Sequence, residues 1–267
     1  MPLPAWLPKL LWMAFRVIAI AWVVAVVGLW LLGNRLMFIP PRPTYRALPS
    51  LVRIPVGADT IAAVWLPNPA ARFTVLYSHG NAEDLGDDLP LLRMLRDRGF
   101  AVLAYDYRGY GLSTGRPSER ATYADEAAAY GWLTRVQHVP AGRIIVHGRS
   151  LGGGPAAELA SREPVGGLVL ESTFTSAQSV SAWGRIFPFD WFRTARRLPE
   201  VRCPVLVIHG TADEVIPFAV GQRLYRLAPG EKQSLWVEGA GHNDLVDVAG
   251  ERYWQALERF AASLPGR

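Results

Sequence analysis

Cysteine is almost absent from this 267-residue sequence, which contains only Cys203. A single cysteine excludes an internal disulfide framework and a cluster of thiolate ligands around a metal. Cys203 precedes Pro204 at the start of an apolar run, so we expect a buried structural thiol rather than a nucleophile. Half of the residues are hydrophobic, and this composition and length suit one large folded domain.

The glycine-rich segments also lack the residues that nucleotide-binding loops need. LGGGP after Ser150 has no P-loop lysine, and GYG after Asp106 lacks the spacing of a dinucleotide-binding turn. The 28 Lys and Arg exceed the 23 Asp and Glu, giving a net charge of +5, but no basic repeat or stacking motif accompanies them. The sequence therefore predicts no cofactor, no metal site and no nucleic-acid partner, and it leaves the oligomeric state open.

Long apolar runs are present at the N-terminus. From Leu10 to Leu32 the only charged residue is Arg16, and the run from Val17 to Leu32 is unbroken. This length can span a bilayer, with Arg16 reaching toward one interface. A cleaved signal peptide is the alternative, but no clear small-x-small cleavage site precedes Arg35. We expect residues 1–38 to form a single-pass membrane anchor.

Basic residues flank this predicted anchor on both sides. Lys9 and Arg16 lie on one side, and the other side carries Arg35, Arg42, Arg46 and Arg53. This balance favours a cytoplasmic location for the rest of the chain, although the charges of a first helix often dominate. A proline-rich linker is expected over residues 39–50 and one large folded domain over 51–267. A form starting near Ala47 should then be soluble and keep the activity of this domain.

Short apolar runs alternate with helical patterns after the linker. The runs cover residues 61–66, 73–80, 101–109, 143–148, 167–172, 204–210 and 234–239. Between them, segments such as 89–99 and 119–136 have apolar residues every three or four positions. This alternation predicts an α/β fold with a mostly parallel, doubly wound sheet and flanking helices. Ligands of such sheets bind at the carboxyl ends of the strands.

Ser150 lies at one of these strand ends, between Gly148 and Gly152. A β-branched run precedes it and good helix formers follow it, so the pattern G-x-S-x-G falls on a strand-to-helix corner. Glycines allow the helix and the strand to approach closely, and the corner presents the serine hydroxyl above the sheet. A capping serine in a glycine-rich loop is the alternative reading of this pentapeptide.

Candidates for a base and an acid follow later strands. GTADEVIP places Asp213 after the run 204–210, and GAGHND places His242 after the run 234–239. A triad needs a base for the serine proton and a carboxylate that orients the base. Glu214 and Asp244 are rival acids, but we expect Glu214 to face the loop and Asp244 to cap the final helix.

The remaining histidines have other expected roles. Each of His79, His147 and His209 directly precedes a glycine at a strand end, where a neutral imidazole packed under a loop is typical. His138 lies near Pro140 in a polar connection and should be exposed.

Five motifs occur in order: SHGNAEDL, DYRGYGLS, GRSLGG, GTADEVIP and AGHND. From about Leu51 onward the chain resembles the α/β-hydrolase superfamily, specifically membrane-associated serine hydrolases akin to acyl-protein depalmitoylases and to lysophospholipid or monoacylglycerol lipases. The resemblance implies a nucleophile, an orienting acid and a general base at Ser150, Asp213 and His242. It also implies oxyanion donors at the backbone N–H groups of Leu151 and Asn81, with Ala82 as the alternative second donor. HGNA replaces the HGGG of many esterases, and a hydrophobic segment replaces the cysteine-rich acylated N-terminus of those depalmitoylases.

An aromatic segment, residues 173–201, lies where α/β-hydrolases usually insert a cap. We expect a short cap in which Trp183, Phe187 and Trp191 bind an acyl chain, although these aromatics could equally close the core. The predicted function is a membrane-anchored serine hydrolase of carboxylic esters or thioesters, with lipid-like acyl groups and an acyl-enzyme on Ser150. The alternative is a catalytically idle hydrolase-fold protein that serves as a membrane partner or scaffold.

Overall fold

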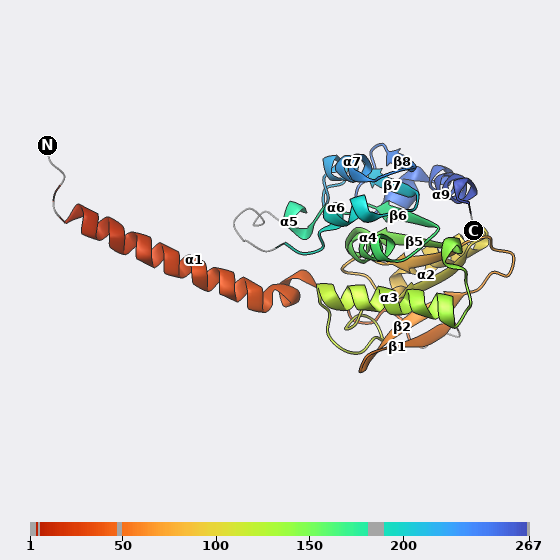
Figure 1. Cartoon of the computed structure of the whole chain (residues 1–267), viewed down its shortest axis with the longest axis horizontal. Helices are drawn as coiled ribbons and strands as arrows, with labels where there is room; N and C mark the ends of the chain where they lie inside the picture. Colours follow the sequence, from red (N-terminus) through yellow and green to blue (C-terminus); the bar gives the residue numbers. More distant parts are fainter. Residues whose placement is uncertain (1–3, 5, 47–49, 181–189, 266–267) are drawn as a thin grey trace.

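A computed structural model describes residues 4, 6–46, 50–180 and 190–265, in which a long helix leads into an α/β domain (Figure 1). One sheet has the strand order β1-β2-β4-β3-β5-β6-β7-β8. Its strands are β1 (Leu51–Val56), β2 (Asp59–Leu66), β3 (Thr74–Ser78), β4 (Ala101–Tyr105), β5 (Ile144–Arg149), β6 (Gly167–Glu171), β7 (Val205–Gly210) and β8 (Lys232–Val237).

In the order β4-β3-β5-β6-β7-β8 all neighbouring strands are parallel. Strand β2 pairs antiparallel with both β1 and β4. After β3 the chain adds β4 on one side and then crosses to add β5 on the other. The strand order therefore reverses at β3 and β5, the place where open α/β sheets bind their ligands. The predicted α/β fold with a mostly parallel sheet is confirmed.

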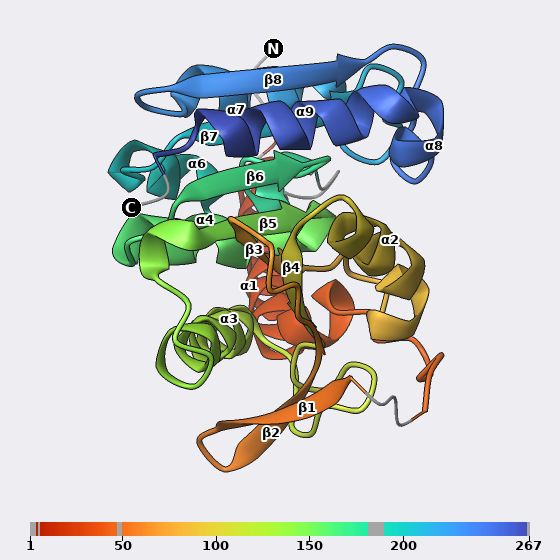
Figure 2. The same cartoon turned by 90° about the vertical axis from the view of Figure 1, so that its right-hand side faces the viewer.

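Helices cover both faces of this sheet. One face carries α3 (Glu119–Arg135), α4 (Gly153–Arg162) and α7 (Phe218–Leu227), and the other carries α2 (Leu85–Asp97) and α9 (Glu251–Ser263). Shorter helices are α5 (Ala177–Val180), α6 (Thr194–Arg197) and α8 (Leu245–Ala249), with 3₁₀ turns at Ala141–Arg143, Ser150–Gly152 and Leu198–Glu200. Figure 2 shows the helices on the two sides of the strands.

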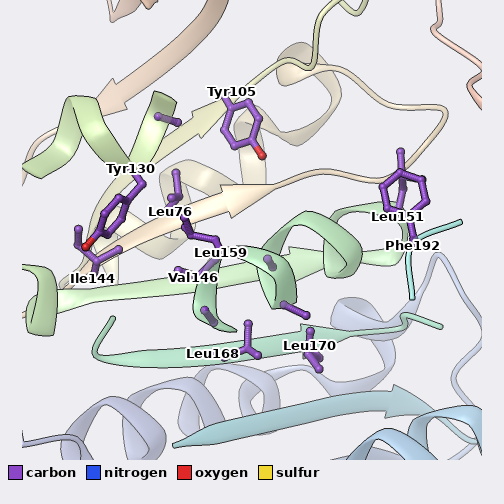
Figure 3. Packing of buried hydrophobic residues seen from close by; sticks show 14 of the residues in the cluster. Leu76, Tyr105, Tyr130, Ile144, Val146, Leu151, Leu159, Leu168, Leu170 and Phe192 are labelled. Atoms are coloured by element: carbon purple, nitrogen blue, oxygen red, sulfur yellow. The ribbon is translucent and has the colours of Figure 1, made fainter. Parts of the chain in front are cut away.

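Alternation along the strands divides the buried side chains between two cores. Figure 3 shows Leu76, Val146 and Leu168 from neighbouring strands, which pack in one core with Tyr130 of α3 and Leu159 of α4. The intervening residues of the same strands enter the second core, against α2 and α9. Burial on both faces explains why the central strands read as continuous apolar runs.

Strand β1 has no counterpart among the apolar runs recognised in the sequence. Arg53 and Pro55 interrupt its apolar pattern, and Ile54 is its only buried residue. An edge strand tolerates proline and charge because one side of it has no pairing partner.

Helix α1 (Leu7–Met37) projects away from the domain (Figure 1). Its segment Leu7–Gly28 has a mean hydropathy of 2.4, is not buried by the rest of the chain, and is a candidate membrane span. At 1.5 Å per residue, these 22 residues extend about 33 Å, which matches the hydrocarbon core of a bilayer.

The proline-rich segment predicted as a linker packs against the domain. Phe38, at the end of the predicted anchor, is 4% exposed, and Tyr45 is 8% exposed. Both side chains belong to the hydrophobic cores of the domain.

Candidate functional site

Ser150 stands at a sharp corner between β5 and α4. Its φ of 50° lies in the left-handed region, which non-glycine residues adopt only when the surrounding structure enforces it. A Cβ atom at Gly148 would lie 2.7 Å from the Cβ of Ala156, and one at Gly152 would collide with the carbonyl of Ser78. These two positions require glycine because helix, corner and neighbouring strand touch there.

The structure brings His242 and Asp213 to this corner. His242 Nε2 lies 3.0 Å from Ser150 Oγ, and His242 Nδ1 lies 2.9 Å from Asp213 Oδ2. Asp213 Oδ1 accepts the backbone N–H groups of Val215 at 3.0 Å and Ile216 at 2.7 Å. A continuous hydrogen-bonded chain therefore runs from carboxylate to imidazole to hydroxyl.

The charge of Asp213 is maintained despite its burial. Burial raises the pKa of this carboxyl, but the hydrogen bonds from His242 and from the Ile216 N–H outweigh it, and the net pKa lies below the ordinary value. Asp213 is thus a carboxylate at neutral pH, and it can fix the tautomer and orientation of the imidazole.

The rival carboxylates hold the His242 loop and not the imidazole. Glu214 is exposed and accepts the backbone N–H of His242 at 3.3 Å. Asp244 accepts the backbone N–H of Gly241 at 2.7 Å and precedes α8, to which its side chain makes no capping bond. The expectation that Asp244 caps the final helix is wrong, because Gly250, with φ of 53°, separates α8 from α9.

The other strand-end histidines are buried beneath the loops, and His138 is exposed. Burial lowers the pKa of His79 to about 4, so this ring is neutral at physiological pH. His147 Nε2 lies 2.8 Å from Glu171, which also accepts the hydroxyl of Tyr253 at 2.7 Å. These contacts leave His242 as the histidine that reaches Ser150.

The loop between β3 and α2 lies beside the serine corner, since β3 and β5 are neighbours. It contains Asn81 and Ala82, and Leu151 directly follows Ser150. The side chain of Asn81 points to the end of α1: its amide donates to the Met37 carbonyl at 2.6 Å and accepts the Tyr110 hydroxyl at 2.7 Å. The assignment of Leu151 and Asn81 as oxyanion donors stays a prediction.

Comparisons with known proteins identify a matching family and similar proteins. A family described as "alpha/beta hydrolase fold" matches residues 74–202. Alpha/beta hydrolase domain-containing protein 17B of Xenopus laevis is 39% identical over 197 residues, which cover 73% of this chain and 68% of that protein. The chain belongs to the alpha/beta hydrolase family.

Other relatives of this chain have similar names. Alpha/beta hydrolase domain-containing protein aho-3 of Caenorhabditis elegans is 45% identical over 185 residues, or 67% of this chain and 55% of that protein. Human alpha/beta hydrolase domain-containing protein 17C is 42% identical over 195 residues, or 72% of this chain and 58% of that protein. The alignments with these two thus span less than two thirds of the relatives' length.

Solved structures share the fold at low sequence identity. The esterase Pf2001 of Pyrococcus furiosus superposes with a TM-score of 0.73 at 20% identity, covering 85% of this chain and 97% of that one. Est1E of Butyrivibrio proteoclasticus superposes with a TM-score of 0.65 at 17% identity, covering 79% of this chain and all of that one.

A salt-bridge cluster that the sequence did not predict joins three loops beside the serine. The guanidinium of Arg149 binds Glu83, the carbonyl of His242 at 3.2 Å and the side-chain oxygen of Asn243 at 3.0 Å. Glu83 also accepts the backbone N–H of Gly80 at 2.8 Å. The motif G-x-S-x-G leaves the position of Arg149 free, and Glu83 lies 66 residues earlier, so no local pattern revealed the pair.

The predicted cap is only partly within the described residues. Trp183 and Phe187 lie outside them. Trp191 is half-buried, and its ring lies against Gly33 of α1, where an added Cβ would be 2.8 Å from it. The neighbouring Phe192 is fully buried in the core. A role for Trp191 in binding an acyl chain stays a prediction.

Among the residues that the structure describes, no group of three or more His, Cys, Asp or Glu side chains could hold a metal ion. Cys203 is half-buried, and burial raises the pKa of its thiol to about 12. This cysteine therefore has the character of a structural thiol.

Proposed function

We propose that this α/β hydrolase cleaves carboxylic esters or thioesters through an acyl-enzyme on Ser150. The hydrogen-bonded chain from Asp213 through His242 to Ser150 is the observation that carries the proposal. Such a chain lets an imidazole take the serine proton while a carboxylate stabilises the resulting imidazolium.

The reaction proceeds in two halves. Ser150 Oγ attacks the substrate carbonyl as His242 accepts its proton, and the backbone N–H groups of Leu151 and Asn81 receive the oxyanion. Collapse of this intermediate expels the alcohol or thiol, which takes the proton from His242. Water then attacks the acyl-enzyme with His242 again as the base, and the carboxylic acid leaves while the serine regains its proton.

The proposed location is a membrane, with Leu7–Gly28 as a single-pass anchor and the catalytic domain on the cytoplasmic side. The apolar, unburied surface of this segment supports its role as an anchor. The excess of arginine after it supports a cytoplasmic location of the catalytic domain. A site beside a bilayer is suited to a substrate with a lipid-like acyl group. Trp191, which lies against Gly33 near the end of α1, could contact such a group. An idle scaffold is the alternative, and no particular observation favours it.

A chain-length series tests the proposal. Specificity constants are measured for p-nitrophenyl esters and matched thioesters with acyl chains of two to sixteen carbons, below their micelle concentrations, with Ser150→Ala as the control. Each buried methylene contributes up to about 0.8 kcal/mol, so medium chains should exceed acetate by one to two orders of magnitude. A monotonic fall beyond acetate refutes the lipid-like acyl group, and equal turnover by Ser150→Ala refutes the serine mechanism.

A further inference from the structure

The segment that joins helix α1 to the α/β domain is hydrogen-bonded to the loop beside the candidate site. We call residues 37–45 the juxtamembrane strap. Phe38 of the strap is buried, with its ring centroid 6.0 Å from that of Phe192, and Tyr45 is buried near the strap's other end. Figure 2 shows the chain after α1 passing beside α2 before it reaches β1.

Asn81 makes the first attachment of the strap. Its side-chain amide donates to the carbonyl of Met37 at 2.6 Å, and its side-chain oxygen accepts the N–H of Ile39 at 3.2 Å. The hydroxyl of Tyr110 donates to the same oxygen at 2.7 Å. An amide side chain carries a separate donor and acceptor, so Asn81 bonds to the strap much as the backbone of a neighbouring strand would.

Asp84 makes the second attachment, at the other end of the same loop. Its carboxylate accepts the backbone N–H of Thr44 at 2.8 Å and also the hydroxyl of Thr44. The strap passes so close to the start of α2 that a Cβ atom at Gly86 would lie 3.0 Å from the Cβ of Tyr45. Glycine at position 86 is what allows this approach.

Tyr45 adds a buried connection between the strap and the sheet. Its hydroxyl donates to the carboxyl of Asp106 at the end of β4, and the second oxygen of that carboxyl accepts the N–H of Leu85 at 3.0 Å. The strap is thus hydrogen-bonded to the loop Gly80–Asp84 at both ends and to the strand end behind it.

We propose that the juxtamembrane strap is a positioning element of the candidate active site, which holds the loop Gly80–Asp84 so that its backbone N–H can receive the oxyanion. This inference rests on the proposed function. An oxyanion donor acts only within hydrogen-bond distance of the developing charge, and a displacement of about 1 Å can cost a large factor in rate. The strap therefore ties the end of the anchor helix to the geometry of catalysis.

Full-length protein in detergent micelles tests this role with two substitutions. Asn81→Ala removes the amide but keeps the backbone N–H, and Tyr110→Phe removes the hydroxyl that bonds to Asn81. Tyr130→Phe is the matched control, because its hydroxyl donates to the Pro164 carbonyl at 2.8 Å and makes no hydrogen bond to the strap. Three quantities are measured for each variant: kcat and KM on a p-nitrophenyl ester, the inhibition constant of a trifluoromethyl ketone, and Tm.

The expected result is a loss in kcat of about tenfold or more for Asn81→Ala, with KM unchanged. The affinity of the trifluoromethyl ketone, whose adduct carries an oxyanion, should fall by a similar factor in Asn81→Ala. Tyr110→Phe should lower kcat and this affinity in the same direction. Tyr130→Phe should keep wild-type kcat.

Two outcomes overturn the inference and are distinguishable. If the wild-type protein turns over the ester in a Ser150-dependent manner and both substitutions leave kcat and inhibitor affinity unchanged, the strap inference alone is refuted. If the wild-type protein shows no Ser150-dependent turnover, the proposed function is refuted and the inference with it.

Discussion

At the residue scale, Arg149 unites the loops that follow three strands of the sheet. Its guanidinium binds Glu83 after β3 and the His242 carbonyl after β8, while Arg149 itself ends β5. The planar fork of arginine can serve several acceptors at once, which a lysine ammonium cannot match. Arg149 therefore holds together the loops that supply the proposed base and oxyanion donor.

Replacing Arg149 with Gln should lower kcat/KM on a p-nitrophenyl ester by about 10- to 100-fold, since hydrogen bonds to charged groups contribute about 1.5–3 kcal/mol. Arg149→Lys should keep part of the activity because it retains the charge. The control is Arg162→Gln on α4, whose partner is Glu158 and whose side chain is 64% exposed. Wild-type kcat/KM in Arg149→Gln contradicts this role.

Asp106 gives a prediction for stability against pH. Burial raises the pKa of its carboxyl to about 7, although the hydrogen bonds from Tyr45 and the Leu85 N–H oppose the rise. Between the ordinary value near 3.8 and about 7, the folded state binds more protons than the unfolded state. The free energy of unfolding therefore falls as pH rises through this interval, by at most about 1.4 kcal/mol per pH unit from this group.

Thermal unfolding of the full-length protein at pH 6 and pH 8 measures this effect, with Asp106→Asn as the reference because it cannot ionise. The wild-type Tm should fall more between the two pH values than the Tm of Asp106→Asn. Parallel changes in the two proteins would show that Asp106 does not carry the pH dependence.

At the element scale, the central strands were predictable from the sequence and the strap was not. Strands buried on both faces leave continuous apolar runs such as Thr74–Ser78 and Val205–Gly210, which can be recognised locally. Phe38 and Tyr45 instead stand among prolines in a segment without periodicity, and Phe192 and Asp106, which they contact, are distant in sequence. Contacts between distant residues leave no local signal, which is also why the Arg149 cluster was missed.

The buried strap determines where the chain can be truncated without loss of the domain's stability. A form starting at Arg35 keeps Phe38 and Tyr45, whereas a form starting at Ala47 lacks both buried aromatic side chains. Loss of one buried aromatic side chain typically costs about 3–5 kcal/mol. The form starting at Ala47, expected from the sequence to keep its activity, should therefore unfold at a clearly lower Tm and lose ester turnover.

Both forms are compared with the full-length protein by Tm and by kcat on the same ester. The form starting at Arg35 should match the full-length protein in both quantities. Equal Tm and kcat in the form starting at Ala47 would show that the strap contributes neither stability nor positioning.

At the scale of the whole molecule, the end of an apolar helix contacts an α/β-hydrolase-fold domain beside the candidate site. The helix was predictable because a long apolar run is a local property, and the order of Ser150, Asp213 and His242 was recognisable from motifs at strand ends. The contact between the end of this helix and the candidate site depends on tertiary packing, which sequence motifs do not reveal.

Full-length protein should sediment with membranes and resist extraction by high salt and by alkaline carbonate, because the apolar surface of the 22-residue segment Leu7–Gly28 would otherwise face water. The form starting at Arg35 should be recovered in the soluble fraction and serves as the control. Recovery of full-length protein in the soluble fraction without detergent contradicts the anchor.

The central claim is that Ser150 is a nucleophile activated by His242 and Asp213. Intact-mass analysis and peptide mapping after treatment with a fluorophosphonate probe test it most directly. The account predicts one adduct, located on Ser150, and no adduct in Ser150→Ala, with labelling in His242→Ala slower by several orders of magnitude. An adduct on another residue, or labelling of His242→Ala at the wild-type rate, would contradict it.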